Sequence, residues 1–290
     1  MSRIVRALSR DGGVLCAVAD TRDIVNEIHR IHKTTPVASA ALGRAATAGA
    51  IMGGFMKNER DLLTLRIDGG GKAGIITVTA DYRGNVRCCA GNYNVDLPLN
   101  LKGKLDVAGY VGASGVLGVI RDTGLKTPHT AQVPLVSGEI AEDITAYYAI
   151  SEQIPTVCGL GVLVDRDWSI KAAGGYLLQL LPPVDESKIA LIENNIKTMQ
   201  SVTEMFEAGM TAEAIALRGL AGMDGEILDE WEIAYKCDCS TERTRQLLVS
   251  LGEDELRSMA ESGEEIEVCC HFCDKKYYFE AQEIIKFENN

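Results

Sequence analysis

The cysteines are the residues whose spacing points most directly to chemistry. Five of the nine lie between residues 237 and 273, where Cys237-Asp-Cys239 is a CxC pair and Cys270-His-Phe-Cys273 is a CxxC pair. Two such pairs that converge on one ion can supply four thiolates in the tetrahedral arrangement of structural zinc sites. The spacing therefore predicts one zinc ion per chain, bound by Cys237, Cys239, Cys270 and Cys273.

The compartment decides how clustered thiols behave. The 290-residue chain is 46% hydrophobic, yet it shows no apolar run of signal-peptide length near its start and no membrane-spanning stretch. We therefore expect a cytoplasmic protein that does not enter membranes. Thiols are kept reduced there, so clustered cysteines favour metal or redox chemistry over structural disulfides.

Other interpretations of the cluster are open. A disulfide framework is one, and a thioredoxin-type CxxC is another, although Cys270 lacks the βαβ context that such a motif needs. His271 could replace one thiol as a ligand. Cys269 could replace Cys270, but the two-residue gap to Cys273 favours Cys270. The remaining cysteines lie in strand-like segments and are predicted to be inert core thiols: Cys16, Cys88, Cys89 and Cys158.

The elements that must position these thiols form a small C-terminal domain, predicted over 232–290. Two short helices are expected between the cysteine pairs, and a strand and a terminal helix after the second pair. This domain has few large apolar residues, and their burial alone cannot stabilise a fold. Metal binding must therefore supply much of its stability. The domain should fold only when metal is bound.

Residues 1–182 predict an α+β domain. A hairpin is expected around Gly12 and Gly13, followed by a helix over 21–32. Thr35 and Pro36 are start signals for a second helix, which is small and apolar on nearly every face and should be buried between two layers. Seven further strands and one acidic helix are predicted. Strands are expected over 62–68, 74–80, 85–90, 115–122, 131–136, 156–164 and 168–181, and the helix over 138–153.

Residues 183–231 read as a helical linker. Helices are predicted over 186–209, 211–220 and 224–233, with Gly209 and Gly222 near their ends. Four of the eight methionines fall in this linker, which favours an adaptable apolar surface, although methionine also fills gaps in ordinary cores. They are Met199, Met205, Met210 and Met223.

Charge is distributed unevenly. Residues 1–182 carry 19 Lys and Arg against 17 Asp and Glu, whereas 183–290 carry 10 against 24. An acidic surface repels phosphate backbones, so a nucleic-acid partner is not expected for the cysteine-rich end.

No enzyme constellation stands out. The segment 68–74, DGGGKAG, has the look of a phosphate loop, but no Ser or Thr follows Lys72 and the flanks are strands, which favours a hairpin turn. No HExxH or GxSxG motif is present among the 290 residues. We predict no catalytic residue and no nucleotide cofactor.

Several stretches along essentially the whole chain resemble the 33 kDa chaperonin (heat shock protein 33) family of redox-regulated bacterial chaperones. They are GEIAEDITAYYAISEQIPT, AAGGYLLQLLP, CDCSTERTRQLLVSLGEDEL and IEVCCHFCDKKYYF. The family pattern places zinc on Cys237, Cys239, Cys270 and Cys273, in agreement with their spacing. Cys269 is an addition to that pattern and could compete in disulfide formation.

The resemblance implies a function in the stress response. It implies an ATP-independent holdase that binds unfolded or oxidatively damaged proteins, is inactive when reduced and zinc-bound, and is a homodimer when active. It also implies that oxidation forms the Cys237–Cys239 and Cys270–Cys273 disulfides and releases the zinc. The linker would then present its apolar face to clients.

Two rival functions belong to other classes. A zinc-dependent thiol oxidoreductase would turn one cysteine over on a substrate, but catalytic zinc keeps an open position and a shell of four thiols does not. A structural zinc-ribbon adaptor would bind a partner protein and would not respond to peroxide.

Overall fold

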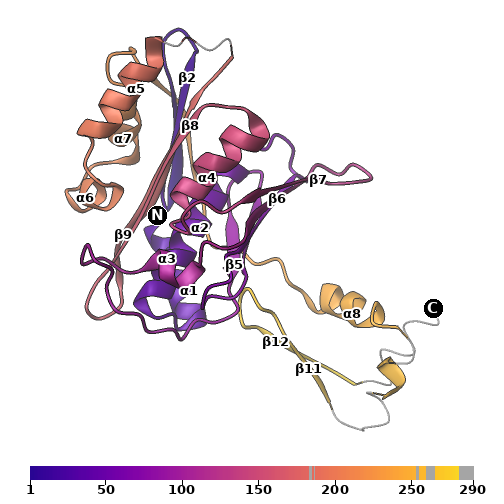
Figure 1. Cartoon of the computed structure of the whole chain (residues 1–290). Helices are drawn as coiled ribbons and strands as arrows, with labels where there is room; N and C mark the ends of the chain where they lie inside the picture. The colour runs from indigo at the N-terminus through magenta and orange to yellow at the C-terminus, as the bar shows by residue number, and fades with distance from the viewer. Residues whose placement is uncertain (183–184, 186, 253–254, 259–264, 281–290) are drawn as a thin grey trace. The chain divides into compact units, whose positions relative to one another are not determined.

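The computed structural model (Figure 1) describes residues 1–182, 185, 187–252, 255–258 and 265–280. The chain forms two compact units, Met1–Lys236 and Cys237–Asn290. The helices predicted for the linker fall within the first unit. The predicted division into 1–182, 183–231 and 232–290 stays a prediction, and Pro183 at its first boundary lies outside the described residues.

The first sheet of the first unit has five antiparallel strands in the order β10-β1-β2-β9-β8. Its hairpin of β1 and β2 turns at Gly12, which has φ 77°, as glycine readily allows. The bounds are β1 Arg3–Leu8, β2 Val14–Asp20, β8 Thr156–Val164, β9 Ile170–Leu180 and β10 Glu226–Glu232.

The second sheet is also five-stranded and antiparallel, in the order β5-β4-β3-β6-β7. The glycine-rich segment 68–74 joins β3 to β4, as the hairpin interpretation predicts. The bounds are β3 Leu62–Asp68, β4 Ile76–Asp81, β5 Val86–Cys89, β6 Val116–Asp122 and β7 His129–Pro134.

Helix α2, Pro36–Gly53, lies between the two sheets and is buried over almost its whole length. Small residues allow the close approach, since a Cβ on Gly49 would lie 2.6 Å from Val78 in the second sheet. The predicted α+β class and its buried central helix are confirmed. Three other helices surround the core: α1 Arg22–His32, α3 Val107–Val111, and α4 Ala141–Tyr147, which runs on as a π-helical turn over Tyr148–Glu152.

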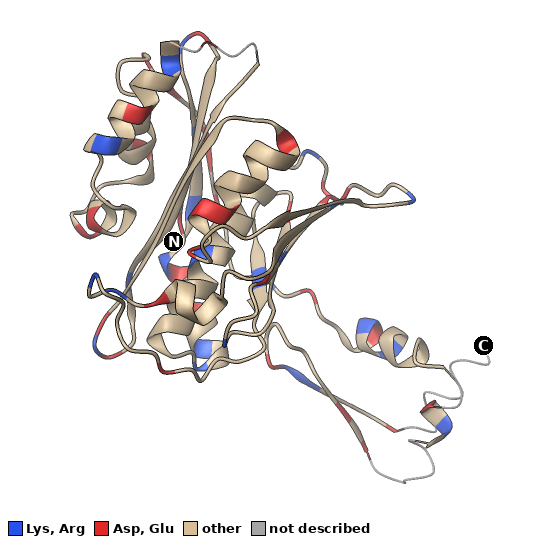
Figure 2. Cartoon of the chain, in the orientation of Figure 1, with Lys and Arg blue, Asp and Glu red and all other residues tan. Residues whose placement is uncertain are grey.

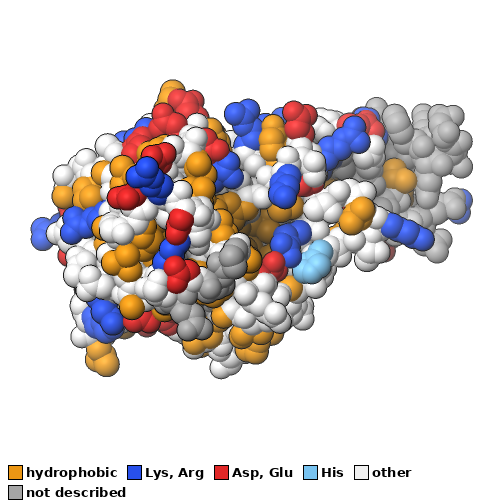
Figure 3. All heavy atoms as spheres, turned by 90° about the horizontal axis from the view of Figure 1, so that it is seen from above, with side chains coloured by type: hydrophobic (Ala, Val, Ile, Leu, Met, Phe, Trp, Pro, Cys, Tyr) orange, Lys and Arg blue, Asp and Glu red, His pale blue; other side chains and the backbone are white. Residues whose placement is uncertain are grey.

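Three linker helices, α5 Ser187–Thr198, α6 Val202–Glu207 and α7 Ala212–Gly219, cover the first sheet on the face away from α2 (Figure 1). The single helix predicted over 186–209 is two helices, because Ser201 starts a new one with a capping box to Glu204. Apolar groups also reach the surface on the side where α5 and α7 lie (Figure 3), and Ile189 and Leu217 are more than a third exposed.

The prediction of a helix over 224–233 is wrong, because Glu226–Glu232 forms β10, antiparallel to β1. Arg6 donates its Nε–H to Asp229 at 2.8 Å, and its guanidinium lies 5.1 Å from the ring centroid of Trp231. These cross-strand contacts outweigh the helix propensity of the Glu-rich segment.

The second unit contains α8 Thr241–Val249 and a hairpin of β11 Ile266–Cys269 with β12 Lys276–Phe279. Charged residues of both signs occur along α8 (Figure 2). The second helix predicted between the cysteine pairs falls largely outside the described residues, and the terminal helix lies wholly outside them. In the described part of the chain, no helix combines the length and apolarity needed to cross a membrane.

Candidate metal centre

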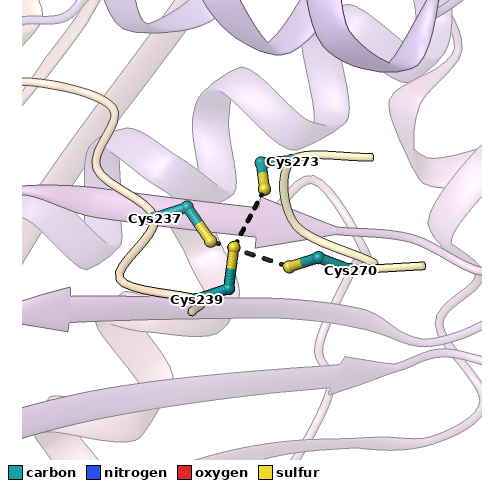
Figure 4. A group of neighbouring side chains, drawn as sticks. All are labelled: Cys237, Cys239, Cys270 and Cys273. Atoms are coloured by element: carbon teal, nitrogen blue, oxygen red, sulfur yellow. Dashed lines mark hydrogen bonds between the residues drawn. The ribbon is translucent and has the colours of Figure 1, made fainter. Parts of the chain in front are cut away.

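Four thiols from two separate segments of the second unit converge (Figure 4). Cys237 and Cys239 precede α8, and Cys270 and Cys273 lie in the turn between β11 and β12. The four Sγ atoms all lie within 4.8 Å of one another. The Sγ atoms of Cys237 and Cys270 are 3.7 Å apart, and those of Cys239 and Cys273 are 3.4 Å apart. The structure thus brings together all four predicted ligands.

Local structure fixes the direction of each pair. Ser240 caps α8 by accepting a hydrogen bond from the backbone N–H of Arg243, so the chain enters the helix directly after the first pair. In the hairpin turn, the backbone N–H of Cys270 donates to Lys275 at 2.9 Å, and that of Asp274 donates to Cys270 at 2.8 Å. Asp274 has φ 56°, a conformation that Asp tolerates and that closes the turn.

The thiol spacing fits a tetrahedral zinc ion. Four sulfurs each ~2.3 Å from one ion are about 3.8 Å apart, close to the two measured Sγ separations. Four soft thiolates also select zinc over hard cations such as Mg²⁺ or Ca²⁺. When bound, zinc would hold all four thiols deprotonated and tie α8 to the hairpin.

The thiols differ in acidity even without the ion. Burial raises the pKa of Cys239, but hydrogen bonds from Tyr277 and the neighbouring thiols outweigh it and lower the pKa to about 7. Burial raises the pKa of Cys237 and that of Cys273. One thiol of the group therefore ionises readily, and this thiol would release its proton first when a metal binds.

Tyr277 is a functional residue that the sequence argument missed. Its hydroxyl donates a hydrogen bond to the Sγ of Cys239 at 3.0 Å. In β12 the side chains of Tyr277 and Phe279 are buried while those of Lys276 and Tyr278 are exposed. The sequence KYYF could not show which tyrosine faces the cysteines, because three aromatic residues follow one another and only the folded strand alternates.

Replacing Tyr277 with Phe should weaken zinc binding by about tenfold, because groups that hydrogen-bond to a ligand hold it in position for the metal. Competition with a chromophoric chelator measures the affinity. Tyr278→Phe is the matched control, since Tyr278 is exposed on the other side of the strand. Equal affinities in the two variants would contradict a role for Tyr277.

The alternative ligands do not join the cluster. Within the described residues, the four-thiol group includes neither Cys269 nor His271, and both side chains are exposed. Cys269 ends β11 opposite Lys276. Of the predicted core thiols, Cys16 and Cys88 are buried and Cys89 and Cys158 are half-buried. Burial raises the pKa of Cys16 to about 12 and also raises that of Cys158, which makes both unreactive.

Serine substitutions at the two adjacent cysteines should separate their roles. Cys270→Ser should lower the zinc content of the purified reduced chain strongly, because it removes one of the four converging sulfurs. Cys269→Ser should leave one equivalent of zinc bound. Metal analysis of both variants is the measurement, and the reverse result would reassign the ligand.

The fold and the site define a class of protein: a two-unit α+β chain whose small C-terminal unit gathers four thiols that could hold a metal ion. The comparisons with known proteins agree with this class. The model of the Hsp33 protein family matches residues 2–280, so the chain belongs to the Hsp33 family.

Similar proteins cover nearly the whole chain. The 33 kDa chaperonin of Clostridium botulinum is 46% identical over 282 residues, covering 97% of this chain and 95% of that protein. The 33 kDa chaperonin of Clostridium beijerinckii is 45% identical over 288 residues, covering 99% and 98%. The crystal structure of the 33 kDa chaperonin of Thermotoga maritima matches with a TM-score of 0.90 at 37% identity, covering 99% and 98%. The predicted family is thereby confirmed.

Proposed function

We propose that this protein is a redox-regulated, ATP-independent holdase of the cytoplasm that prevents unfolded and oxidatively damaged proteins from aggregating. Reduced, it binds one zinc ion through Cys237, Cys239, Cys270 and Cys273 and is inactive. Oxidised, it has lost the zinc, forms a homodimer and binds clients under oxidative stress. It performs no catalysis and needs no nucleic acid or membrane. Membership of a family of named chaperones supports this proposal.

The observation that carries the proposal is a four-thiol cluster inside a unit with a very small core. Four buried side chains form the described core of the second unit: Leu248, Leu256, Tyr277 and Phe279. Cys239 and Cys270 pack against this core. The unit therefore depends on the state of its thiols, which is the property that a redox switch needs.

The switch step forms two disulfides. The thiolates of Cys237 and Cys239 lose two electrons and join, and those of Cys270 and Cys273 do the same. Each pair reduces one hydrogen peroxide to two water molecules, with two protons taken from solvent. All four residues that would hold the zinc ion would then be in disulfides. Thiolates held by a metal would remain nucleophilic toward peroxide.

The client-binding surface would come from the linker helices. Their apolar sides face a sheet, where Ile192, Met205 and Ile215 are buried against Val18 and Leu178. Release of these helices would uncover two apolar surfaces at once, one on the helices and one on the sheet. Exposed apolar surface of this kind binds non-native proteins, and methionine side chains adapt to varied partners.

Aggregation of a chemically denatured client, followed by light scattering, tests this function. The reduced, zinc-bound chain should suppress aggregation weakly. After peroxide treatment and mild heating it should suppress aggregation strongly, having released one equivalent of zinc. ATP should change neither result. A chain that is equally active before and after zinc release would contradict the switch, and activity that requires ATP would contradict the holdase.

A further inference from the structure

The outer edge of β8 is open over part of its length. β8 is an edge strand, paired only to β9 among the described strands. The backbone N–H of Leu180 donates to Pro155, and the backbone N–H of Cys158 donates outward to Thr145 of α4. Because the two directions alternate along an antiparallel strand, Leu160 and Val162 also direct their N–H and C=O groups away from β9. No hydrogen bond between described residues reaches these outward N–H groups.

A cleft of about 580 Å³ lies along this open edge. Its walls are β8, the first turns of α2, the segment 99–105, the turn that carries Trp168, and the start of α6 at Val202. Several lining groups are apolar and accessible. Leu99 is 59% exposed and Trp168 is 44% exposed.

The charge of the cleft is opposite to that of the chain. Arg44, Lys104 and Arg166 line it. Arg44 is paired with Glu139, whereas neither Lys104 nor Arg166 forms a salt bridge within the part of the chain that the structure describes. Asp165, the lining carboxylate, is already paired with Lys171 at 3.1 Å. Three cations, Arg44, Lys104 and Arg166, thus line the cleft against the single carboxylate of Asp165, although Glu204 lies near enough to Lys104 to interact with it. In a chain of net charge -12, this local excess of cations beside an apolar cleft favours an occupant that carries carboxylates.

We propose that this cleft binds one extended, apolar, acidic-ended segment of a non-native protein, which adds as a strand to β8 between Leu160 and Val164. The outward backbone groups of β8 supply hydrogen bonds, the apolar walls take alternate side chains, and Lys104 and Arg166 hold terminal carboxylates. At about 3.4 Å per residue, the open edge accommodates roughly five residues. The inference rests on the proposed function and gives it a second client contact. The reduced chain already offers this contact, but one short bound segment does not by itself prevent a client from aggregating.

Strand β7 of the second sheet shows how a proline can prevent strand addition at such an edge. In the other sheet, the backbone N–H of Leu135 donates to Gly115, which places the even-numbered residues of β7 with their N–H groups outward. Pro134 occupies one of these outward positions without interrupting the pairing. A proline at the equivalent outward position of β8, Val162→Pro, should therefore remove one edge donor and keep the β8–β9 ladder.

The test uses the reduced, zinc-loaded full chain and a labelled heptapeptide of alternating valine and threonine with glutamate at both ends. Binding is followed by fluorescence anisotropy. Val162→Pro should weaken binding by about tenfold, and Gln132→Pro, the matched change on β7, should not. Lys104→Glu and Arg166→Glu should each weaken it by about threefold or more, unlike Lys126→Glu in the β6–β7 turn.

Modified peptides keep the test decisive even if a proline variant fails to fold. Two peptides N-methylated at alternate residues are compared with wild-type protein. Strand addition predicts that one methylated set loses binding and the other, whose N–H groups face solvent, retains it. Equal binding of both sets, or of Val162→Pro and Gln132→Pro, overturns the proposal.

Aggregation suppression after peroxide is measured on the same samples, so the two ideas can fail separately. If the wild-type chain suppresses aggregation but does not bind the peptide, only the proposal for the cleft is contradicted. If it binds the peptide but never suppresses aggregation, the proposed function is contradicted.

Discussion

Stripping zinc from the reduced chain should unfold the second unit and leave both sheets of the first unit folded. Structural zinc contributes on the order of 10 kcal/mol to the folding of small thiolate modules. The four buried side chains of this unit would each contribute roughly 2 kcal/mol by burial, which the entropy of ordering about fifty residues easily outweighs. The first unit has no such dependence, because its core spans two sheets and α2.

Hydrogen exchange read by mass spectrometry distinguishes the two units. After chelation under reducing conditions, α8 and the β11–β12 hairpin should exchange at nearly the rate of an unfolded chain. Strands β2, β3 and β9 should stay protected. Cys237→Ser should reproduce the chelated state without a chelator, and Cys89→Ser, outside the cluster, should not. Protection of α8 after complete zinc loss would show that burial alone holds the unit.

The sequence predicted most strands of the first unit because their signals are local. Alternation and glycine turns mark β1 to β4, and the all-round apolarity of α2 shows directly that it is buried. β10 escaped prediction because its partner, β1, lies more than 200 residues away. A Glu-rich segment acquires strand structure there only through contacts such as Arg6 with Asp229, which no local pattern reports.

In the candidate metal centre, too, features with a local sequence signal were predicted and features set by long-range packing were not. Ligand spacing predicted that the four thiols would converge, because CxC and CxxC pairs determine sulfur positions almost by themselves. The Tyr277 hydrogen bond to Cys239 could not be predicted in that way, since it depends on how the hairpin faces α8 across a cluster already formed. The location of the linker helices on the first sheet likewise depends on long-range packing that periodicity alone does not specify.

Adding one methyl group to the first sheet, by the substitution Gly161→Ala, should release the linker helix α6 from that sheet. Gly161 of β8 and Gly174 of β9 are directly opposite each other and leave a patch of sheet without side chains. The first turn of α6 packs on it: a Cβ on Gly161 would lie 2.9 Å from Cγ2 of Thr203 and 3.3 Å from Cβ of Val202. The three nearest heavy atoms that this Cβ would meet all belong to the start of α6, so the strain of Gly161→Ala falls on the linker.

Gly161→Ala should therefore destabilise the packing of α6 by about 1–3 kcal/mol, the usual effect of inserting a methyl group into a filled contact. The side chain of Met205, which α6 buries fully against the sheet, should become accessible, and hydrogen exchange in α6 should rise while zinc content stays at one equivalent. If α6 masks a client-binding surface, the reduced variant should suppress aggregation partly without peroxide. Met205→Gln should also destabilise the packing of α6, because it places a polar side chain between α6 and the sheet.

Gly118→Ala on β6 is the matched control, since its added Cβ would meet only ordinary contacts at 3.7–3.9 Å. It should change neither exchange in α6 nor the activity of the reduced chain. If Gly161→Ala raises exchange in α6 and still leaves the reduced chain inactive, release of α6 is not what activates the protein. The client surface would then have to lie on α5, on α7 or elsewhere on the sheet.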